Sequence, residues 1–507
     1  MSAFTDLMAD DYAEKIYLVE VVGYNTVTDQ EETLYYSSQK YTTEPWETPA
    51  NQHYDPIMSD ERLTLFSRSL FSVEASFGQV VLDNMGGDLD YLFDYAFNGR
   101  AITVKLGGKA FNYADFGTVL SGVIDQAIFE YDVVRFVVRG NLYKLQVPLN
   151  TTTYAGTNSG STGNEGLADD IKGAPKSLCY GECKNVPITP VNTSAYRYQF
   201  HSAGTSSAVD SVYDKGALQT ITTDYTNDLT NGIIDLVTTP DGQVTADVKG
   251  DATGSGYIST CADIVSRIIT TRTVYTTSDL DTSSFTALNT ANSAALGVFF
   301  PPQEITVLEA ITSLMESVGA HIFERRDGLL KVLRFNGVVG SSVASFGVGD
   351  ITENTFKTVS SDYEVPIYQA KTGYGKNWTV QNKNELAAGV TDARVAYLEQ
   401  EYRYSAPSGA LDATIKDIWL NATIFTKDTL IVNSADADTE SIREFNLRSV
   451  PHREFELEVK TSAFTIDIGD IITITHPRFG FSAGQDVIIT EMKEDTRNST
   501  AMLKVFL

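Results

Sequence analysis

Residues 303–335, QEITVLEAITSLMESVGAHIFERRDGLLKVLRF, carry the clearest structural signal in the chain. Apolar residues recur every three or four positions in the first half of this stretch, and Thr306 and Glu309 have the spacing of a capping box. Gly319 stands where a helix usually ends, and Asp327–Gly328 lies between two apolar runs, as in a tight hairpin turn. The stretch predicts a helix packed on a β-hairpin.

Three other segments predict helices. One is the amphipathic run CADIVSRIIT at 261–270. A longer helix is predicted over 383–404, with Asn384 as its cap and Gly389 as its main breaker. In the third segment, 88–100, Asp88 stands at the N-cap position, Asn98–Gly99 supplies the stop, and four apolar residues share one helical face: Leu89, Leu92, Phe93 and Ala96.

Most of the remaining chain consists of short alternating or β-branched runs between turn residues. The sequence therefore predicts a β-dominated α+β protein of several domains. The expected divisions are an N-terminal β-rich tube-like domain at 1–147, a Gly/Ser/Thr/Asn-rich crossing at 148–178, a β-sandwich-like domain at 179–258, a helix-plus-hairpin domain at 259–362 and a C-terminal β-barrel-like domain with one longer helix at 363–507.

Composition limits the function. The chain has 507 residues, a formal net charge of −28 and 11% aromatic residues, so it is long enough for several cores and too aromatic for a disordered chain. Sequence-independent binding to nucleic acid or anionic membranes needs a surplus of Lys and Arg, which this chain lacks. We expect neither a signal peptide nor a stable membrane insertion, and we expect folding in the cytosol.

No common catalytic or phosphate-binding motif occurs in the sequence. Cys179 and Cys183 are four residues apart, and the next candidate ligands for a metal are Cys261 and His201. Structural cysteines are the favoured reading, although a site of three cysteines and one histidine stays open. The five histidines are scattered without metal spacing, so we expect structural roles for them: His53, His201, His321, His452 and His476.

Acidic and glycine-rich segments give little chemical information. Asp436, Asp438 and Glu440 alternate like the start of a Ca²⁺ loop, but Ser441 and Leu447 stand where that loop needs Gly and Glu, so solvated loops or caps are expected. GDATGSGY, at 250–257, is expected to be a turn, because it lacks the flanking strand and helix of a phosphate cradle.

Aromatic residues cluster in a polar, proline-containing stretch: Tyr35, Tyr36, Tyr41, Trp46 and Tyr54. The favoured expectation is a loop that packs its tyrosines on its own domain. The alternative is an exposed surface that stacks on carbohydrate or contacts protein.

The run at 37–58, SSQKYTTEPWETPANQHYDPIM, followed by the run at 76–107, resembles the N-terminal domain of tail-tip or baseplate hub proteins of long-tailed, siphovirus-like phages and prophages. Gly86–Gly87, Asp90 and Gly99–Arg100 occupy the places of that family's motif. The similarity continues through 171–192, 196–220, 306–335, 374–390 and 464–489, so it extends over nearly the whole chain. Some hubs hold an iron–sulfur cluster on C-terminal cysteines, but no cysteine follows Cys261 here.

The resemblance implies a virion structural protein of the tail tip, assembled in the host cytoplasm, and not an enzyme. Such hubs are usually homotrimers with two tube-like β-barrels per subunit. The implied partners are the distal tail ring, a central fibre or tip attachment protein, and the tape-measure protein. DNA would pass through the lumen without specific binding. No catalytic, cofactor-binding or metal-binding residue and no cofactor is expected.

Two alternatives stay open. The surplus of acidic and aromatic residues is compatible with a tail-associated polysaccharide-degrading enzyme, which product release from host polysaccharide would reveal. The aromatic cluster is compatible with a carbohydrate-binding receptor protein, which a glycan array would reveal.

Overall fold

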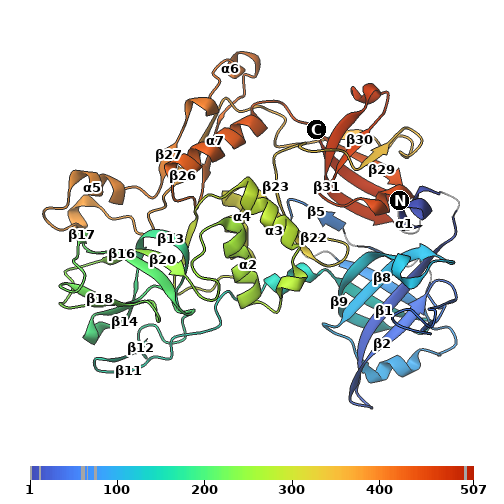
Figure 1. Ribbon diagram of the computed structural model, residues 1–507, viewed down its shortest axis with the longest axis horizontal. Coiled ribbons are helices and arrows are strands. Elements are labelled where there is room, and N and C mark those ends of the chain that lie inside the picture. The colour runs from blue at the N-terminus through green and yellow to red at the C-terminus, as the bar shows by residue number, and fades with distance from the viewer. Residues whose placement is uncertain (1–2, 11–12, 59–62, 66, 73–76, 496–499) are drawn as a thin grey trace.

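The computed structural model describes residues 3–10, 13–58, 63–65, 67–72, 77–495 and 500–507. Figure 1 shows an elongated molecule in which two β-sheets lie next to each other at one end, helices lie in the middle, and a second group of β-sheets lies at the other end. Both chain termini lie at the end with the two sheets. Strands predominate over helices, which confirms the predicted β-dominated α+β class.

The first sheet is antiparallel and is built from residues 15–139. Its strands alternate in burial, as Val134, Phe136 and Val138 show in β10, so one face packs on the core. The strand order is β2-β1-β8-β9-β10-β6, with β7 paired to β1. The bounds are β1 Lys15–Asn25, β2 Gln30–Ser37, β6 Phe77–Asp83, β7 Tyr95–Ala96, β8 Ala101–Gly108, β9 Gly117–Phe129 and β10 Val133–Arg139.

The helix predicted within 88–100 is wrong. The structure has only the 3-10 helix η2, Asp90–Asp94, followed at once by strand β7. Leu92 is buried as expected, but Phe93 is 77% exposed, and the residue at the N-cap is Leu89 rather than Asp88. Pairing of β7 with β1 replaces the second helical turn, so a tertiary contact overrides the local pattern.

Two further sheets share one core. The larger has the order β17-β16-β20-β13-β21: β13 Leu178–Pro187, β16 Ser206–Asp214, β17 Ala217–Leu218, β20 Val244–Asp251 and β21 Gly297–Phe300. The smaller has the order β14-β15-β19-β18: β14 Thr189–Asn192, β15 Arg197–Gln199, β18 Tyr225–Asp228 and β19 Ile233–Leu236. Before them, the glycine-rich crossing contains a small hairpin, β11 Thr157–Ser159 with β12 Thr162–Leu167.

The helical module contains α2 Cys261–Arg272, α3 Thr282–Ala291, α4 Val307–Ser317 and the hairpin of β22 Ala320–Glu324 and β23 Leu330–Arg334. The predicted capping box is present: the Thr306 hydroxyl accepts from the Glu309 amide, and the Glu309 carboxylate accepts from the Thr306 amide. Gly319 follows α4 with a φ of 65°, which favours glycine. The predicted helix on a hairpin is confirmed.

The predicted helix over 383–404 is wrong as a single helix. It divides into a 3-10 turn at Lys383–Glu385 and α5, Asp392–Leu398, because Gly389 has a φ of 89° and interrupts it. Asn382, not Asn384, caps the first piece. The neighbouring elements are β26 Gln369–Tyr374, β27 Arg403–Ser405, α6 Ile415–Ile418, β28 Ile424–Asp428 and α7 Ser434–Arg448.

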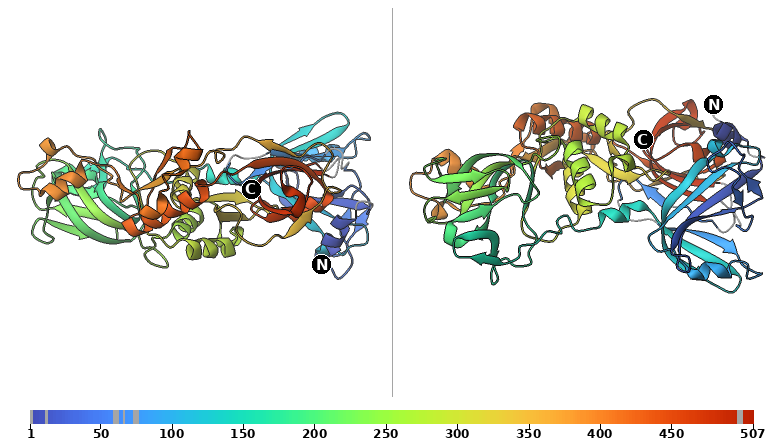
Figure 2. Two further views of the ribbon diagram at one scale, coloured as in Figure 1. Left: turned by 90° about the horizontal axis from the view of Figure 1, so that it is seen from above. Right: turned by 60° about the horizontal axis from the view of Figure 1, so that its bottom comes forward.

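The last sheet has the order β24-β30-β31-β32-β29-β25 and appears strongly curved in Figure 2. Its strands are β24 Ala344–Phe346, β25 Lys357–Val359, β29 Glu454–Lys460, β30 Ile471–Ile474, β31 Gln485–Asp495 and β32 Thr500–Phe506. β5, Ser67–Ser69, also pairs with β31. The other short elements are α1 Ala3–Ala9, β3 Tyr41–Thr42, β4 His53–Tyr54 and 3-10 turns at Tyr113–Asp115, Asn141–Leu145, Thr193–Ala195, Thr277–Asp279, Ser408–Ala410, Thr461–Thr465 and Phe481–Ala483.

Candidate functional site

The three cysteines lie in two different places. Cys179 and Cys183 are buried in β13, and the Cys179 amide donates to His201 Nδ1 at 3.2 Å. Cys261 is buried in the helical module, where its thiol donates to the Leu314 carbonyl at 3.5 Å. Burial raises the pKa of the Cys183 and Cys261 thiols, which favours the protonated form that binds metals poorly. Within the described residues no group of three His, Cys, Asp or Glu side chains is placed to hold a metal ion.

The histidines remain apart, and each packs into its own surroundings. His201 is buried with Nε2 3.7 Å from Asp251 Oδ1. His321 stacks edge-on against Phe71, and burial with nearby cations lowers its pKa to about 4. His452 lies between the carbonyls of Leu447 and Leu507. The other two lie beside Asp55 and Phe356: His53 and His476.

The acidic triplet at 436–440 does not form solvated loops or caps throughout. Asp436, Asp438 and Glu440 all lie within α7, and Glu440 is fully buried against Arg334, Lys427 and Arg443. The prediction was wrong because buried ion pairs are invisible in a sequence pattern. By contrast, residues 252–257 form the expected turn, with Gly254 and Gly256 at positive φ. The stated reason was wrong, because strand β20 leads directly into this turn and helix α2 begins at Cys261, a few residues after it.

The aromatic cluster packs on its own sheet, as favoured. Tyr36, Tyr41 and Tyr54 are buried, and Tyr54 makes edge-on contacts with Tyr35 and Tyr41. Trp46 is the exception, with 76% exposure. Most rings of this cluster are therefore buried and do not form an exposed surface on which a carbohydrate could stack.

A glycosidase needs a carboxylic acid with a raised pKa as its general acid. Burial raises the pKa of Glu324 to about 7, but the cavity beside Glu324 has a volume of only about 30 Å³, which is too small for a sugar. A larger cavity of about 220 Å³ borders α7, where Lys427 and Arg443 lower the pKa of Glu444 to about 2. These two carboxylates fit that catalytic role poorly.

The structural feature that sequence reasoning missed is the joint between the first and last sheets. β5, from the N-terminal part of the chain, pairs with β31: Ser67, Arg68 and Ser69 lie opposite Lys493, Met492 and Glu491. Phe464, from the C-terminal part, is buried in the core of the first sheet together with Met8. The last sheet therefore contains a strand from the N-terminal region, and the core of the first sheet contains a side chain from the C-terminal region.

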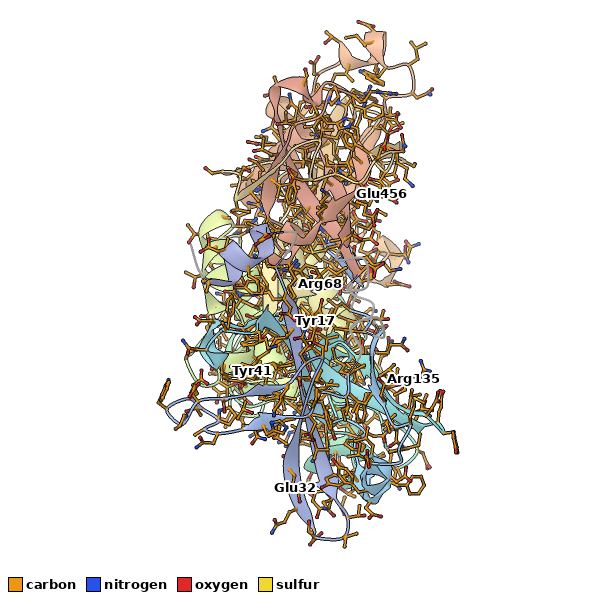
Figure 3. All side chains as sticks on the ribbon, turned by 90° about the vertical axis from the view of Figure 1, so that its right-hand side faces the viewer. Tyr17, Glu32, Tyr41, Arg68, Arg135 and Glu456 are labelled. Atoms are coloured by element: carbon orange, nitrogen blue, oxygen red, sulfur yellow. The ribbon has the colours of Figure 1, made fainter. Side chains whose placement is uncertain are left out.

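A largely buried ion cluster holds this joint; it is formed by Arg68, Arg326, Asp467 and Glu494. Arg68 contacts Asp467 at 3.0 Å and Glu494 at 3.3 Å, and Arg326 also pairs with Glu494. The Glu494 side chain is 1% exposed and that of Arg68 is 8% exposed, so removing one partner leaves charge in a desolvated place. Figure 3 shows Arg68 between the two sheets, with Glu456 above it and Tyr17 below.

The described residues contain no helix that is both long and apolar enough to span a bilayer. The joint itself presents no chemistry beyond ion pairing and hydrogen bonding. What it can do is hold two barrel-like sheets in one subunit as neighbours, with both chain termini close by (Figures 1 and 2).

Comparison with known proteins gave no matching family model and no matching curated protein. The chain is similar to three solved tail proteins. The first is a tail protein from Neisseria meningitidis MC58, with 10% identity and a TM-score of 0.41 over 98% of this chain and 97% of that one. The second is a prophage MuSo2 43 kDa tail protein from Shewanella oneidensis, with 10% identity and a TM-score of 0.40 over 97% of this chain and 98% of that one. The third is a prophage tail protein from Listeria monocytogenes EGD-e, with 8% identity and a TM-score of 0.37 over 97% of this chain and 94% of that one. All three are described as tail proteins, and the Shewanella and Listeria proteins are described as prophage proteins. Identities and scores this low carry no inference about activity or partners.

Proposed function

We propose that the chain is the structural hub of a phage tail tip. The observation that carries the proposal is the joint, in which β5 and the buried ion cluster hold two barrel-like sheets next to each other within one subunit. Three such subunits around an axis would present six sheets to a hexameric tail ring. The ordered sequence motifs along the chain support the same role.

In this proposal the subunit forms a homotrimer that joins the distal tail ring to the central fibre or tip attachment protein. The tape-measure protein ends in the lumen, and the hub opens to let it and the DNA pass. The net charge of −28 suits such a channel, because carboxylates repel phosphates and DNA can pass without binding. The proposal places the chain in the virion tail and assigns no catalytic, cofactor-binding or metal-binding residue.

The test is the mass of the purified protein by light scattering, together with the composition and reconstruction of tails from intact particles. A trimer in solution or on the tail ring, located at the tip with both sheets facing the ring, is the expected result. A strictly monomeric chain that is absent from purified particles would contradict the proposal.

A further inference from the structure

Three turns meet at the end of the first sheet that lies away from the last sheet. They are the β1–β2 turn at 26–29, the loop at 84–94 and the β9–β10 turn at 130–132. The Asn84 amide donates to the Asp132 carbonyl at 2.7 Å, and the Thr26 amide donates to the Asp94 carbonyl at 2.9 Å. In Figure 3, Glu32 marks the β1–β2 hairpin at this end, opposite Glu456 in the last sheet.

This end exposes large apolar side chains. The group, named here the apolar end, consists of Val27, Met85, Tyr91, Phe93 and Tyr131, which are 73%, 86%, 46%, 77% and 97% exposed. Ring contacts hold two of them in place: Phe93 lies edge-on to Phe129 at 5.4 Å, and Tyr91 lies edge-on to Tyr95 at 6.1 Å. Clustered apolar exposure of this kind marks an interaction site.

Carboxylates surround the apolar end. The same three turns, all within the described residues, contain neither Lys nor Arg. The nearby Arg135 already pairs with Glu130 at 3.1 Å, and Arg100 pairs with Glu31. The exposed acidic residues of the turns are Asp29, Asp88, Asp90, Asp94, Glu130 and Asp132.

We propose that the apolar end docks onto another tail protein whose contact surface combines apolar residues with a surplus of Lys and Arg. Apolar contact would supply affinity, and the carboxylates would select a basic partner. The apolar end of a second copy of this chain does not fit as the partner, since its carboxylates would repel the carboxylates of the first copy. The inference rests on the proposed function, because it assumes that the chain is part of a tail.

The first experiment places photo-reactive benzoylphenylalanine in place of Tyr131 or Phe93 and irradiates purified tails. The matched control carries it in place of Val274, which is 78% exposed in the helical module. The expected product joins position 131 or 93, but not 274, to a Lys- and Arg-rich peptide of a different tail protein. Cross-links to another copy of this chain, or none, overturn the inference. A chain that is absent from tails overturns the proposed function, and the docking surface falls with it.

The second experiment measures incorporation into tails. Two double variants are expected to lower incorporation at least about 10-fold: Phe93→Ser with Tyr131→Ser, and Asp88→Lys with Asp94→Lys. The control variant Val274→Ser should leave incorporation unchanged. Unchanged thermal unfolding of the purified variants shows that the loss is one of docking. Normal incorporation of both double variants contradicts the inference.

Discussion

The joint between the two sheets and the apolar end of the first sheet have opposite arrangements of charge and apolar surface. At the joint, Arg68 and Glu494 are buried, Arg326 is mostly buried, and both arginines pair with Glu494. At the apolar end, Phe93 and Tyr131 face solvent, and carboxylates surround them. Buried charge is stable only when it is paired within the chain, whereas exposed apolar surface gains free energy only when a partner covers it. The joint is therefore complete in one subunit, and the apolar end is not.

The largest expected effect comes from breaking the joint. Glu494→Ala leaves Arg68 and Arg326 buried without this shared carboxylate, and should lower the free energy of unfolding by about 3–5 kcal/mol. Denaturant unfolding of the purified protein measures it. The control is Glu130→Ala, which removes a largely exposed pair with Arg135 and should cost about 0–1 kcal/mol. Equal losses in the two variants would mean that the joint is not specially stabilised.

The next largest effect should be the pH dependence of Glu324, which lines a small cavity at the joint together with Arg68 and Glu494. Burial raises the pKa of Glu324 to about 7 from an ordinary 4.5, so the folded state keeps a proton that the unfolded state releases. The resulting stabilisation is fully present below pH 4.5 and is lost as the pH rises through 7. Glu324→Gln should therefore gain roughly 2–3 kcal/mol relative to the wild type between pH 5 and pH 8.

Unfolding curves of both proteins at several pH values measure this difference. The lowered pKa of His321 has the opposite sign, because its contribution is lost as the pH falls from 6.5 toward 4. The wild type and Glu324→Gln share the His321 contribution, so it cancels when their free energies of unfolding are subtracted. A pH-independent difference would show that Glu324 does not titrate in this range.

A smaller effect is expected where the apolar end is held together. The Asn84 side chain accepts from the Leu89 amide at 2.8 Å and donates to Asp90 at 2.9 Å. Asn84→Ala should cost about 1–2 kcal/mol, since the buried Leu89 amide loses its acceptor. Thermal unfolding measures the loss, and the exposed Asn98→Ala serves as the control. Faster hydrogen exchange confined to 84–94 would locate the change.

The smallest effect on folding should come from the apolar end itself. Phe93→Ser with Tyr131→Ser removes exposed rings and should change the free energy of unfolding by no more than about 0.5 kcal/mol per site. Phe136→Ala, at a buried ring in the same sheet, should cost about 3–5 kcal/mol. A large loss in the double variant would show that these rings stabilise the subunit, and the contrast with the joint would disappear.

The sequence predicts an element well where local interactions suffice. The capping box, apolar period and Gly319 all lie within 303–335, and α4 with its hairpin forms as expected. Prediction from the sequence fails where a contact with a distant part of the chain decides which element forms. α7 was not predicted because two of its buried positions are occupied by Glu440 and Glu444, which form ion pairs with Lys427. With charged residues at buried positions, the segment lacks the apolar period of an amphipathic helix. The short helix near 90 was overpredicted because β7 pairs with β1.

The sequence alone determined the β-dominated class, the strand and turn chemistry, the helix at 307–317 and the acidic balance, because each depends on residue types or on neighbours a few positions apart. Only the tertiary structure decided which cysteines stay apart, that β5 pairs with β31, and which rings remain exposed. The pairs of Arg68 with Asp467 and Glu494 span 399 and 426 positions. No local pattern encodes such a contact, since strand pairing and charge burial depend on how distant segments pack in three dimensions.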